Sequence, residues 1–183
     1  WDFQETIHDL WDYDIPSPPI LHELKINDQL FEVVISLTKT GNTLIFERNT
    51  GKPIFDINYR EAPKSDVPGE VTSKYQIYLE KPEAFSKIEF SLGDINQLSK
   101  SKQKEIKKKL ENAKYGWYEP PSLEKDLIIF GIHGGAEWMG GAIDPIKQKL
   151  FIPVNNYPWK LKPYMASIEL STNFSGEMKN FKK

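Results

Sequence analysis

The 183-residue sequence contains no cysteine. Disulfide bonds, thiolate metal sites and cysteine nucleophiles are therefore excluded. No run of about 18 apolar residues occurs, so the sequence predicts no membrane-spanning helix. The net charge is only −2, from 24 Lys and Arg against 26 Asp and Glu, and it gives no reason to expect nucleic acid as a partner. The motifs GxGxxG, GxxxxGK[ST] and HExxH are also absent, which leaves nucleotide phosphate loops and zinc metalloproteases without support.

The first residues, WDFQETIHD, lack an initiator methionine and the basic segment, apolar stretch and cleavage site of a secretion signal. We therefore expect Trp1 to be a cut point in a longer protein, or the start of a processed piece, with any targeting signal upstream.

What the sequence does contain is a series of short β-rich runs separated by Gly, Pro and Asn. FEVVISL (31–37) and TLIF, from Thr43, are joined by KTGN, which predicts two adjacent antiparallel strands. A turn at Asn49–Gly51 then precedes a third strand that ends near Ile57. Further strands are expected within 126–132, 142–156 and 165–170, whereas residues 60–92 give no clear pattern. Many short strands at regular spacing indicate an all-β sandwich, barrel or propeller.

One segment differs from this pattern. Residues 94–114 contain no proline or glycine and are rich in Lys, Glu, Gln and Leu, which predicts an amphipathic surface helix, interrupted near Ser99–Ser101. Its basic face could contact anionic lipid or another subunit, but a solvated face is the favoured interpretation. The apolar stripe consists of Ile95, Leu98, Ile106, Leu110 and Ala113.

The densest group of polar side chains is HDLWDYDIP (8–16), which the following prolines make a loop or a short edge strand. Its carboxylates could bind a hard cation or act as a general base beside an aromatic wall. The alternative is that the aspartates cap turns and Trp11 packs in the core. Likewise, Lys39 in KTGN could be a site residue or an ordinary exposed turn lysine.

GGAEWMGGAIDP (134–145) places four glycines around Glu137 and Trp138. This composition suggests that the backbone approaches a flat or bulky group closely, with Trp138 available for stacking. His133 could be a ligand, although a lone histidine is more often structural.

In order and content, HDLWDYDIP, TKTGNTLIFERNTGKPI and GGAEWMGGAIDP resemble three motifs of the pyrroloquinoline quinone (PQQ)-dependent dehydrogenases, most closely the membrane-bound glucose dehydrogenase type. YGWYEPPS (115–122) resembles the segment that leads, in this family, to the Glu-Trp (EW) pair found here at 137–138. Trp1 resembles the tryptophan that closes the family's repeated blade motif. The resemblance covers nearly the whole chain. It implies a quinoprotein oxidoreductase with an eight-bladed β-propeller that faces the periplasm.

Since a four-stranded blade takes about 40–50 residues, residues 1–183 would form a partial propeller domain of about three to four blades. Residues 94–114 would be a helical insertion between blades.

The resemblance also implies the cofactors and the roles of individual residues. PQQ would bind with Ca²⁺ or Mg²⁺, whose ligands lie mostly outside this chain. Asp12 would be the general base for hydride transfer, and Lys39, 27 residues later (39 − 12 = 27), would contact the quinone oxygens. Glu137 and Trp138 would lie near the cofactor. His8 and Asp9 would orient the loop, and Asp14 would support it.

The expected partners are a sugar or alcohol, the remaining blades of the parent chain and a quinone electron acceptor. We expect the isolated chain to be inactive. The alternative is a non-catalytic propeller fragment that serves as an interaction scaffold, which would have no need for Asp12, Lys39 and the EW pair together.

Overall fold

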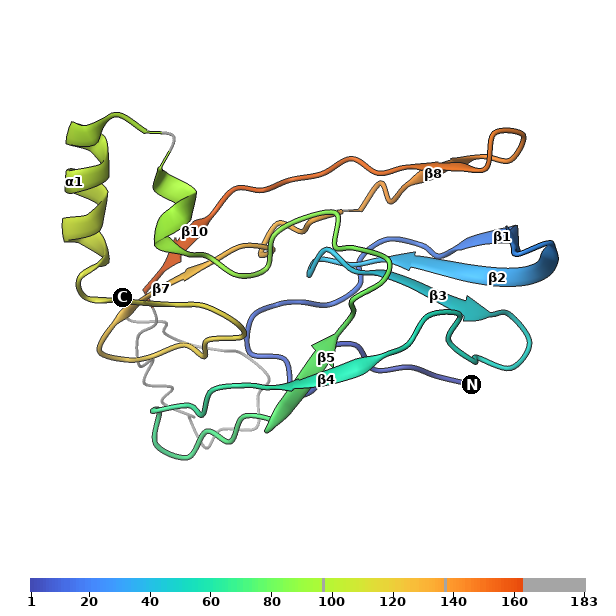
Figure 1. Cartoon of the computed structure of the whole chain (residues 1–183). Coiled ribbons are helices and arrows are strands. Elements are labelled where there is room, and N and C mark those ends of the chain that lie inside the picture. Colours follow the sequence, from blue (N-terminus) through green and yellow to red (C-terminus); the bar gives the residue numbers. More distant parts are fainter. Residues whose placement is uncertain (97, 137, 163–183) are drawn as a thin grey trace, which may run out of the picture.

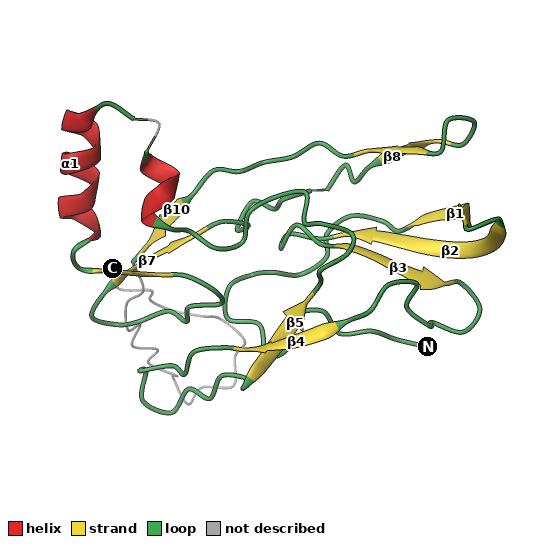
Figure 2. Cartoon of the chain, in the orientation of Figure 1, coloured by secondary structure: helices red, strands yellow, loops and turns green. Residues whose placement is uncertain are grey.

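Short β-strands joined by long loops make up most of the chain (Figures 1 and 2). The computed structural model describes residues 1–96, 98–136 and 138–162. Within these residues the strands form four small sheets, and helical structure is confined to η1 and α1. The all-β class predicted from the sequence is confirmed. In chain order the elements are β1 (Ile20–Ile26), β2 (Gln29–Leu37), β3 (Thr43–Glu47), β4 (Asn58–Glu61), β5 (Tyr75–Tyr78), η1 (Leu92–Ile95), α1 (Lys100–Leu110), β6 (Ala113–Tyr115), β7 (Asp126–Ile129), β8 (Ala142–Asp144), β9 (Lys149–Phe151) and β10 (Trp159–Leu161).

The first sheet is an antiparallel meander of β1, β2 and β3. Apolar residues alternate along β2, so Val33, Ile35 and Leu37 share one face and are at most 3% exposed. They pack with Ala136 in one core cluster. The turn 38–42 joins β2 to β3. Because the end of β2 is buried in this cluster, the start of the turn has a fixed position.

Trp1 packs against β3 and the turn predicted at Asn49–Gly51. Its indole Nε1 donates to the carbonyl oxygen of Arg48 at 2.9 Å, and its ring centroid lies 5.4 Å from that of Phe46. Gly51 has a φ of +72°, and a Cβ atom there would lie 2.5 Å from the Trp1 ring. The turn therefore needs glycine both for its backbone conformation and for the space that the tryptophan occupies.

The strand predicted to end near Ile57 is wrong. Only an isolated bridge between Phe46 and Pro53 forms there, and the next strand is β4, whose four residues are all exposed. Pro53 has no N–H to continue a ladder of hydrogen bonds, and Ile54 packs into the core without belonging to a strand.

The later strand predictions have mixed outcomes. The range 142–156 contains the hairpin of β8 and β9, and the range 126–132 begins with β7. The predicted strand at 165–170 lies outside the described residues. β1 was not predicted, although its side chains alternate between exposed and half-buried, and neither were β4 and β5, which pair antiparallel, nor β6 and β10.

Helical structure covers only part of the predicted range 94–114, because α1 ends at Leu110 and residues 113 and 114 belong to strand β6. The short 3₁₀ helix η1 is separated from α1 near the expected interruption, and the Ser99 side chain caps α1 by accepting a hydrogen bond from the Lys102 backbone. Ile95, Ile106 and Leu110 of the predicted apolar stripe pack into a cluster with residues of β7, as does Ala113, whereas Leu98 is 41% exposed.

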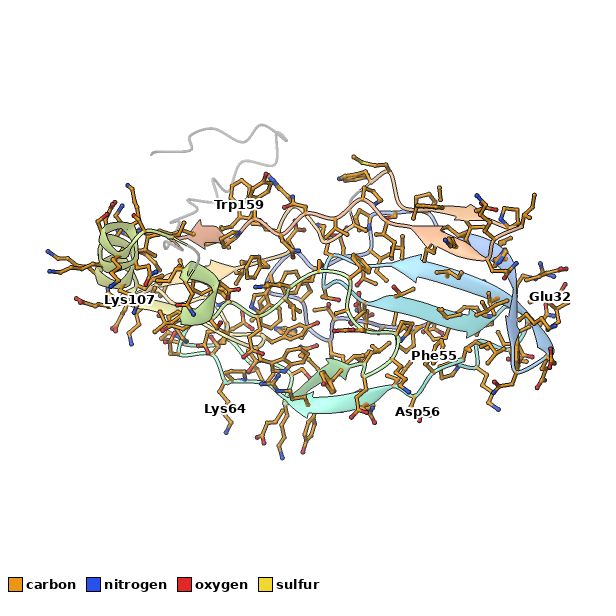
Figure 3. The ribbon with its side chains drawn as sticks, turned by 45° about the horizontal axis from the view of Figure 1, so that its top comes forward. Glu32, Phe55, Asp56, Lys64, Lys107 and Trp159 are labelled. Atoms are coloured by element: carbon orange, nitrogen blue, oxygen red, sulfur yellow. The ribbon has the colours of Figure 1, made fainter. Side chains whose placement is uncertain are left out.

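The molecule is elongated, with β1–β2–β3 and the β8–β9 hairpin at one end and α1 with β6, β7 and β10 at the other (Figures 1 and 3). Lys107 on α1 and Glu32 on β2 mark the two ends in Figure 3. Across the described residues, no helix is both long enough and apolar enough to cross a membrane.

Candidate active site

Residues 8–16 form a loop whose shape is set by Asp9. The Asp9 carboxylate accepts hydrogen bonds from the backbone N–H groups of Trp11, at 2.8 Å, and Tyr13, at 2.7 Å. His8 and Asp12 both have positive φ angles, of 53° and 65°. Aspartate and histidine adopt this conformation more readily than most other residues with side chains, so the sequence tolerates the tight path. Asp9 has the orienting role that the resemblance implied.

Two buried aromatic residues anchor this loop to the second half of the chain. Trp11 and Tyr13 are each 2% exposed. The Trp11 indole donates to the carbonyl oxygen of Glu119 at 2.7 Å, and the Tyr13 hydroxyl donates to that of Phe130 at 2.9 Å. The Tyr118 ring packs edge-on against both. Because its two neighbours are held inward, Asp12 is directed outward, with a side chain that is 70% exposed.

Lys39 lies in the turn 38–42 and extends its ammonium group to this loop. Its Nζ atom lies 2.8 Å from the Asp12 carbonyl oxygen, 3.2 Å from Asp12 Oδ2 and 2.5 Å from Asp14 Oδ1. The Lys39 side chain is only 8% exposed, whereas the Asp14 side chain is 56% exposed. The predicted base and the predicted cofactor lysine are therefore in direct contact, and we call Asp12, Asp14 and Lys39 the acid–lysine cluster.

Burial and hydrogen bonding act in opposite directions on Lys39. Burial alone would lower the pKa of the ammonium group, but hydrogen bonds to Asp14 and Asp12 outweigh it and raise the pKa above its ordinary value. Lys39 is thus a permanent cation at neutral pH. It is not the exposed turn lysine of the alternative interpretation.

The glycines near the EW pair approach protein rather than open space. The Gly135 N–H donates to the Lys39 carbonyl oxygen at 3.0 Å. Gly131 has a φ of +87°, and a Cβ atom there would lie 2.9 Å from the same oxygen and 3.0 Å from the Tyr13 ring. A Cβ on Gly141 would meet Leu37 at 2.6 Å. The expected close approach of a flat or bulky group is made by protein at Gly135 and Gly141, because the side chains of Ser86 and Leu37 occupy the space where a Cβ atom would lie.

The remaining candidates are Glu137, Trp138 and His133. Glu137 lies outside the described residues. Trp138 is described, and its ring is 74% exposed, which leaves a face accessible for stacking. The His133 ring packs edge-on against Trp159 with centroids 4.3 Å apart, in agreement with a structural role.

The structure adds two residues that sequence reasoning did not assign to the site. Asp14, expected to be a loop support, makes the shortest contact to Lys39. Glu5 is 3% exposed and bonds to the turn that carries Lys39. Asp14 could have been suspected because it lies two residues from Asp12 in the same carboxylate-rich loop, whereas nothing in the sequence singles out Glu5.

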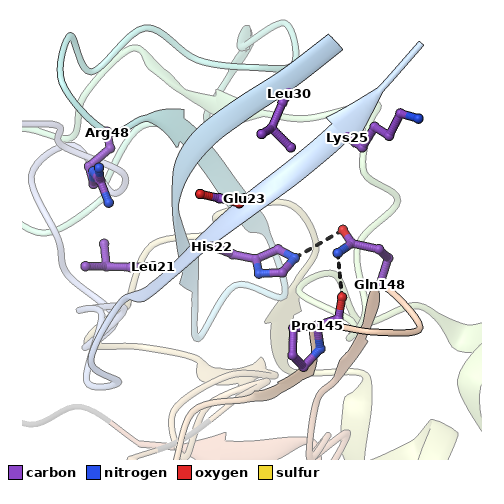
Figure 4. A pocket seen from close by; sticks show the side chains of 8 residues that line it. All are labelled: Leu21, His22, Glu23, Lys25, Leu30, Arg48, Pro145 and Gln148. Carbon is purple, nitrogen blue, oxygen red and sulfur yellow. Dashed lines mark hydrogen bonds between the residues drawn. The ribbon is translucent and has the colours of Figure 1, made fainter. Parts of the chain in front are cut away.

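The described residues form no metal site, and their pocket beside β1 lies apart from the acid–lysine cluster. Within residues 1–96, 98–136 and 138–162, no three His, Asp or Glu side chains are placed to hold a metal ion. A surface pocket of about 490 Å³ lies between β1 and the β8–β9 hairpin (Figure 4). There His22 Nε2 lies 3.1 Å from Gln148 Oε1, which joins the two hairpins, but the pocket shares no residue with the acid–lysine cluster.

Comparison with known proteins assigns the chain to a family. The sequence model described as "PQQ: Glucose/ethanol/alcohol dehydrogenase, beta-propeller domain" matches residues 1–180. Quinoprotein glucose dehydrogenase A of Acinetobacter calcoaceticus is 32% identical over 156 residues, which are 81% of this chain and 19% of that protein. The glycerol dehydrogenase large subunit of Gluconobacter thailandicus is 34% identical over 149 residues, 79% of this chain and 20% of the relative.

Quinoprotein glucose dehydrogenase of Escherichia coli is 27% identical over 155 residues, again 81% of this chain and 19% of the relative. The chain therefore spans about a fifth of the length of these relatives. No solved structure matches it. The match over residues 1–180 and the identities over four fifths of the chain agree with the motifs and with the mostly β structure: the chain belongs to the β-propeller domain family of PQQ-dependent glucose, ethanol and alcohol dehydrogenases.

Proposed function

We propose that the protein that carries this chain oxidises a sugar or an alcohol with PQQ, using Asp12 as the general base and Lys39 as a cofactor contact. The observation that carries the proposal is the acid–lysine cluster, in which a buried ammonium group lies against two exposed carboxylates from a loop 25 to 27 residues away. The relatives named as glucose and glycerol dehydrogenases give the substrate class.

The cluster fits a cofactor that presents carboxylate and carbonyl oxygens. An ammonium group has three N–H donors, and the three oxygens within reach of Lys39 Nζ occupy them. The contact to Asp12 Oδ2 is the longest, at 3.2 Å, so it is the one that yields most easily to a cofactor oxygen. Asp14 and the Asp12 carbonyl would still hold the lysine in place.

When bound, PQQ would supply a two-electron oxidant that accepts hydride from the carbon bearing the substrate hydroxyl. The exposed Asp12 carboxylate is accessible to a substrate hydroxyl and would take its proton at an Oδ atom. Lys39, held as a cation by its two carboxylate neighbours, would stabilise negative charge on an adjacent oxygen. The accessible Trp138 ring would stack on the cofactor, with Glu137 nearby.

The proposal extends to the rest of the protein. Residues 1–183 form one part of a propeller domain, and Ca²⁺ or Mg²⁺ would take most of its ligands from the other blades. The complete protein would work on the periplasmic side of the membrane and pass electrons to a quinone acceptor. These statements rest on membership of the family and on the motifs.

The test compares Asp12→Asn and Lys39→Ala in the complete protein, reconstituted with PQQ and Ca²⁺. Asp12→Asn removes the base but keeps the side-chain shape, so we expect turnover in a dye-reduction assay to fall by about 10²–10⁴. Lys39→Ala should raise the dissociation constant for PQQ as well as lower turnover.

Matched controls are available at exposed positions. Asp28→Asn, in the β1–β2 turn, and Lys147→Ala, in the β8–β9 turn, make the same chemical changes away from the cluster and should leave turnover unchanged. If neither Asp12→Asn nor Lys39→Ala alters turnover, the assignment is wrong. A scaffold without catalysis would give no dye reduction even in the complete wild-type protein.

A further inference from the structure

A second carboxyl group, that of Glu5, contacts the Lys39 turn through Thr40 and Asn42 rather than through Lys39 itself. Glu5 is 3% exposed. Its Oε1 atom accepts hydrogen bonds from Thr40 Oγ1, at 2.5 Å, and from Asn42 Nδ2, at 3.1 Å. Its other oxygen, Oε2, is buried and has no hydrogen-bond partner among the described residues. These hydrogen bonds of the Glu5 carboxyl group therefore both go to the turn that carries Lys39.

The turn is a network of hydrogen bonds with Glu5 at one edge. The Thr38 and Thr40 hydroxyls lie 2.8 Å apart, and the Asn42 N–H donates to Thr38 Oγ1 at 3.0 Å. Thr38 and Thr40 are at most 1% exposed. Lys39 lies between these two threonines, so its backbone is fixed by side chains on both sides.

We propose that Glu5 is a positioning residue of the candidate active site, which holds the Thr38–Asn42 turn in the conformation that directs Lys39 to Asp12 and Asp14. The inference rests on the proposed function of Lys39 and extends it to a residue that no motif contains. The N-terminal segment then contacts the turn at two places: Glu5 binds Thr40 and Asn42, and the loop that carries Asp12 and Asp14 binds Lys39.

The burial of Glu5 supports a positioning role over a merely structural one. Burying a carboxyl group with one unbonded oxygen destabilises a fold, and an apolar side chain would fill the same volume without that penalty. The titratable groups that act on Glu5 or feel its charge are Asp9 and Tyr118, neither of which compensates a buried negative charge. What the carboxyl group provides is a pair of directed acceptor contacts to Thr40 and Asn42.

The test is a double-mutant cycle in the complete protein, read out as dye-linked turnover and as the dissociation constant for PQQ. Glu5→Leu keeps the volume but removes the acceptor, so turnover should fall about tenfold or more through misplacement of Lys39. Glu5→Gln keeps an acceptor oxygen and should restore most of the turnover. Combined with Lys39→Ala, Glu5→Leu should cause no further loss, because the group that it positions is already gone.

The control is Glu23→Leu, on the exposed side of β1, which should leave turnover and PQQ binding unchanged. If Glu5→Leu does not fold, Thr40→Val removes one donor to Glu5 at nearly constant volume and takes its place in the cycle with Lys39→Ala.

The proposal is overturned if the variant used turns over substrate like the wild type, or if its effect multiplies with that of Lys39→Ala. A failure of the proposed function itself looks different, because then Asp12→Asn and Lys39→Ala would already leave turnover unchanged.

Discussion

The ionisation of Glu5 should make the fold less stable as the pH rises towards neutrality. Burial raises the pKa of the Glu5 carboxyl group from 4.5 to about 7, against the smaller opposing effect of hydrogen bonds from Thr40 and Asn42. The unfolded chain therefore loses this proton at a lower pH than the folded chain. The stabilising contribution is complete below pH 4.5 and is lost as the pH rises through about 7.

The size of the effect follows from the same pKa values. Since one pKa unit corresponds to about 1.4 kcal/mol, a rise of about 2.5 gives a loss of about 3 kcal/mol between pH 4.5 and pH 8. Glu5→Gln cannot ionise, so the difference in unfolding free energy between this variant and the wild type should change by about that amount over the same range. The variant should be relatively more stable at pH 8 than at pH 4.5.

The assay is urea unfolding of the complete protein and of its Glu5→Gln variant at four or five pH values between 4.5 and 8. Taking the difference between the two proteins removes the contributions of all other titrating groups. Glu23→Gln, at an exposed position, serves as the control and should show a constant difference. A constant difference for Glu5→Gln as well would refute the reasoning, because it would mean that Glu5 titrates alike in the folded and unfolded chains.

Two further predictions concern packing and completeness. Gly131→Ala forces a Cβ atom against the Lys39 carbonyl oxygen and the Tyr13 ring, whereas Gly116→Ala has the same kind of backbone conformation, with a φ of +131°, but open space around it. Thermal unfolding should therefore show Gly131→Ala to be less stable than Gly116→Ala by about 1–3 kcal/mol, and equal losses would contradict the packing. The isolated chain, which spans about a fifth of its relatives, should not reduce dye when supplied with PQQ and Ca²⁺, and measurable turnover would show that it needs no other blade.

The order of the motifs was enough to predict the family, because it depends on residue identity and spacing alone. The resemblance implied that Asp12 and Lys39 act at the same cofactor, but their direct contact was not predicted, since hydrogen bonds across 27 residues depend on how the loop and the turn pack. Asp14 was interpreted as a loop support for the same reason: its closeness to Asp12 in the sequence does not show which cation reaches it.

The sequence predictions failed where a local sequence pattern did not identify the residues that it contacts in the fold. Glycine at 135 and 141 indicates that something approaches the backbone closely, and the sequence could not show that neighbouring segments of the same chain fill this space. The run before Ile57 is apolar enough for a strand, yet Pro53 interrupts the ladder. Glu5 belongs to no motif, and only the folded chain shows that it is buried against Thr40.

The acid–lysine cluster depends on hydrogen bonds within the N-terminal segment and on anchors far away in the sequence. All of them lie within this one part of a propeller. Its hydrogen bonds, together with those of Glu5, join residues 25 to 37 positions apart, all within the first 42 residues. The support beneath them is different, since Trp11 and Tyr13 bind carbonyl groups 108 and 117 positions away. The first segment can therefore bring base and lysine together, but the direction in which Asp12 points depends on the strand and loops around residues 117–135.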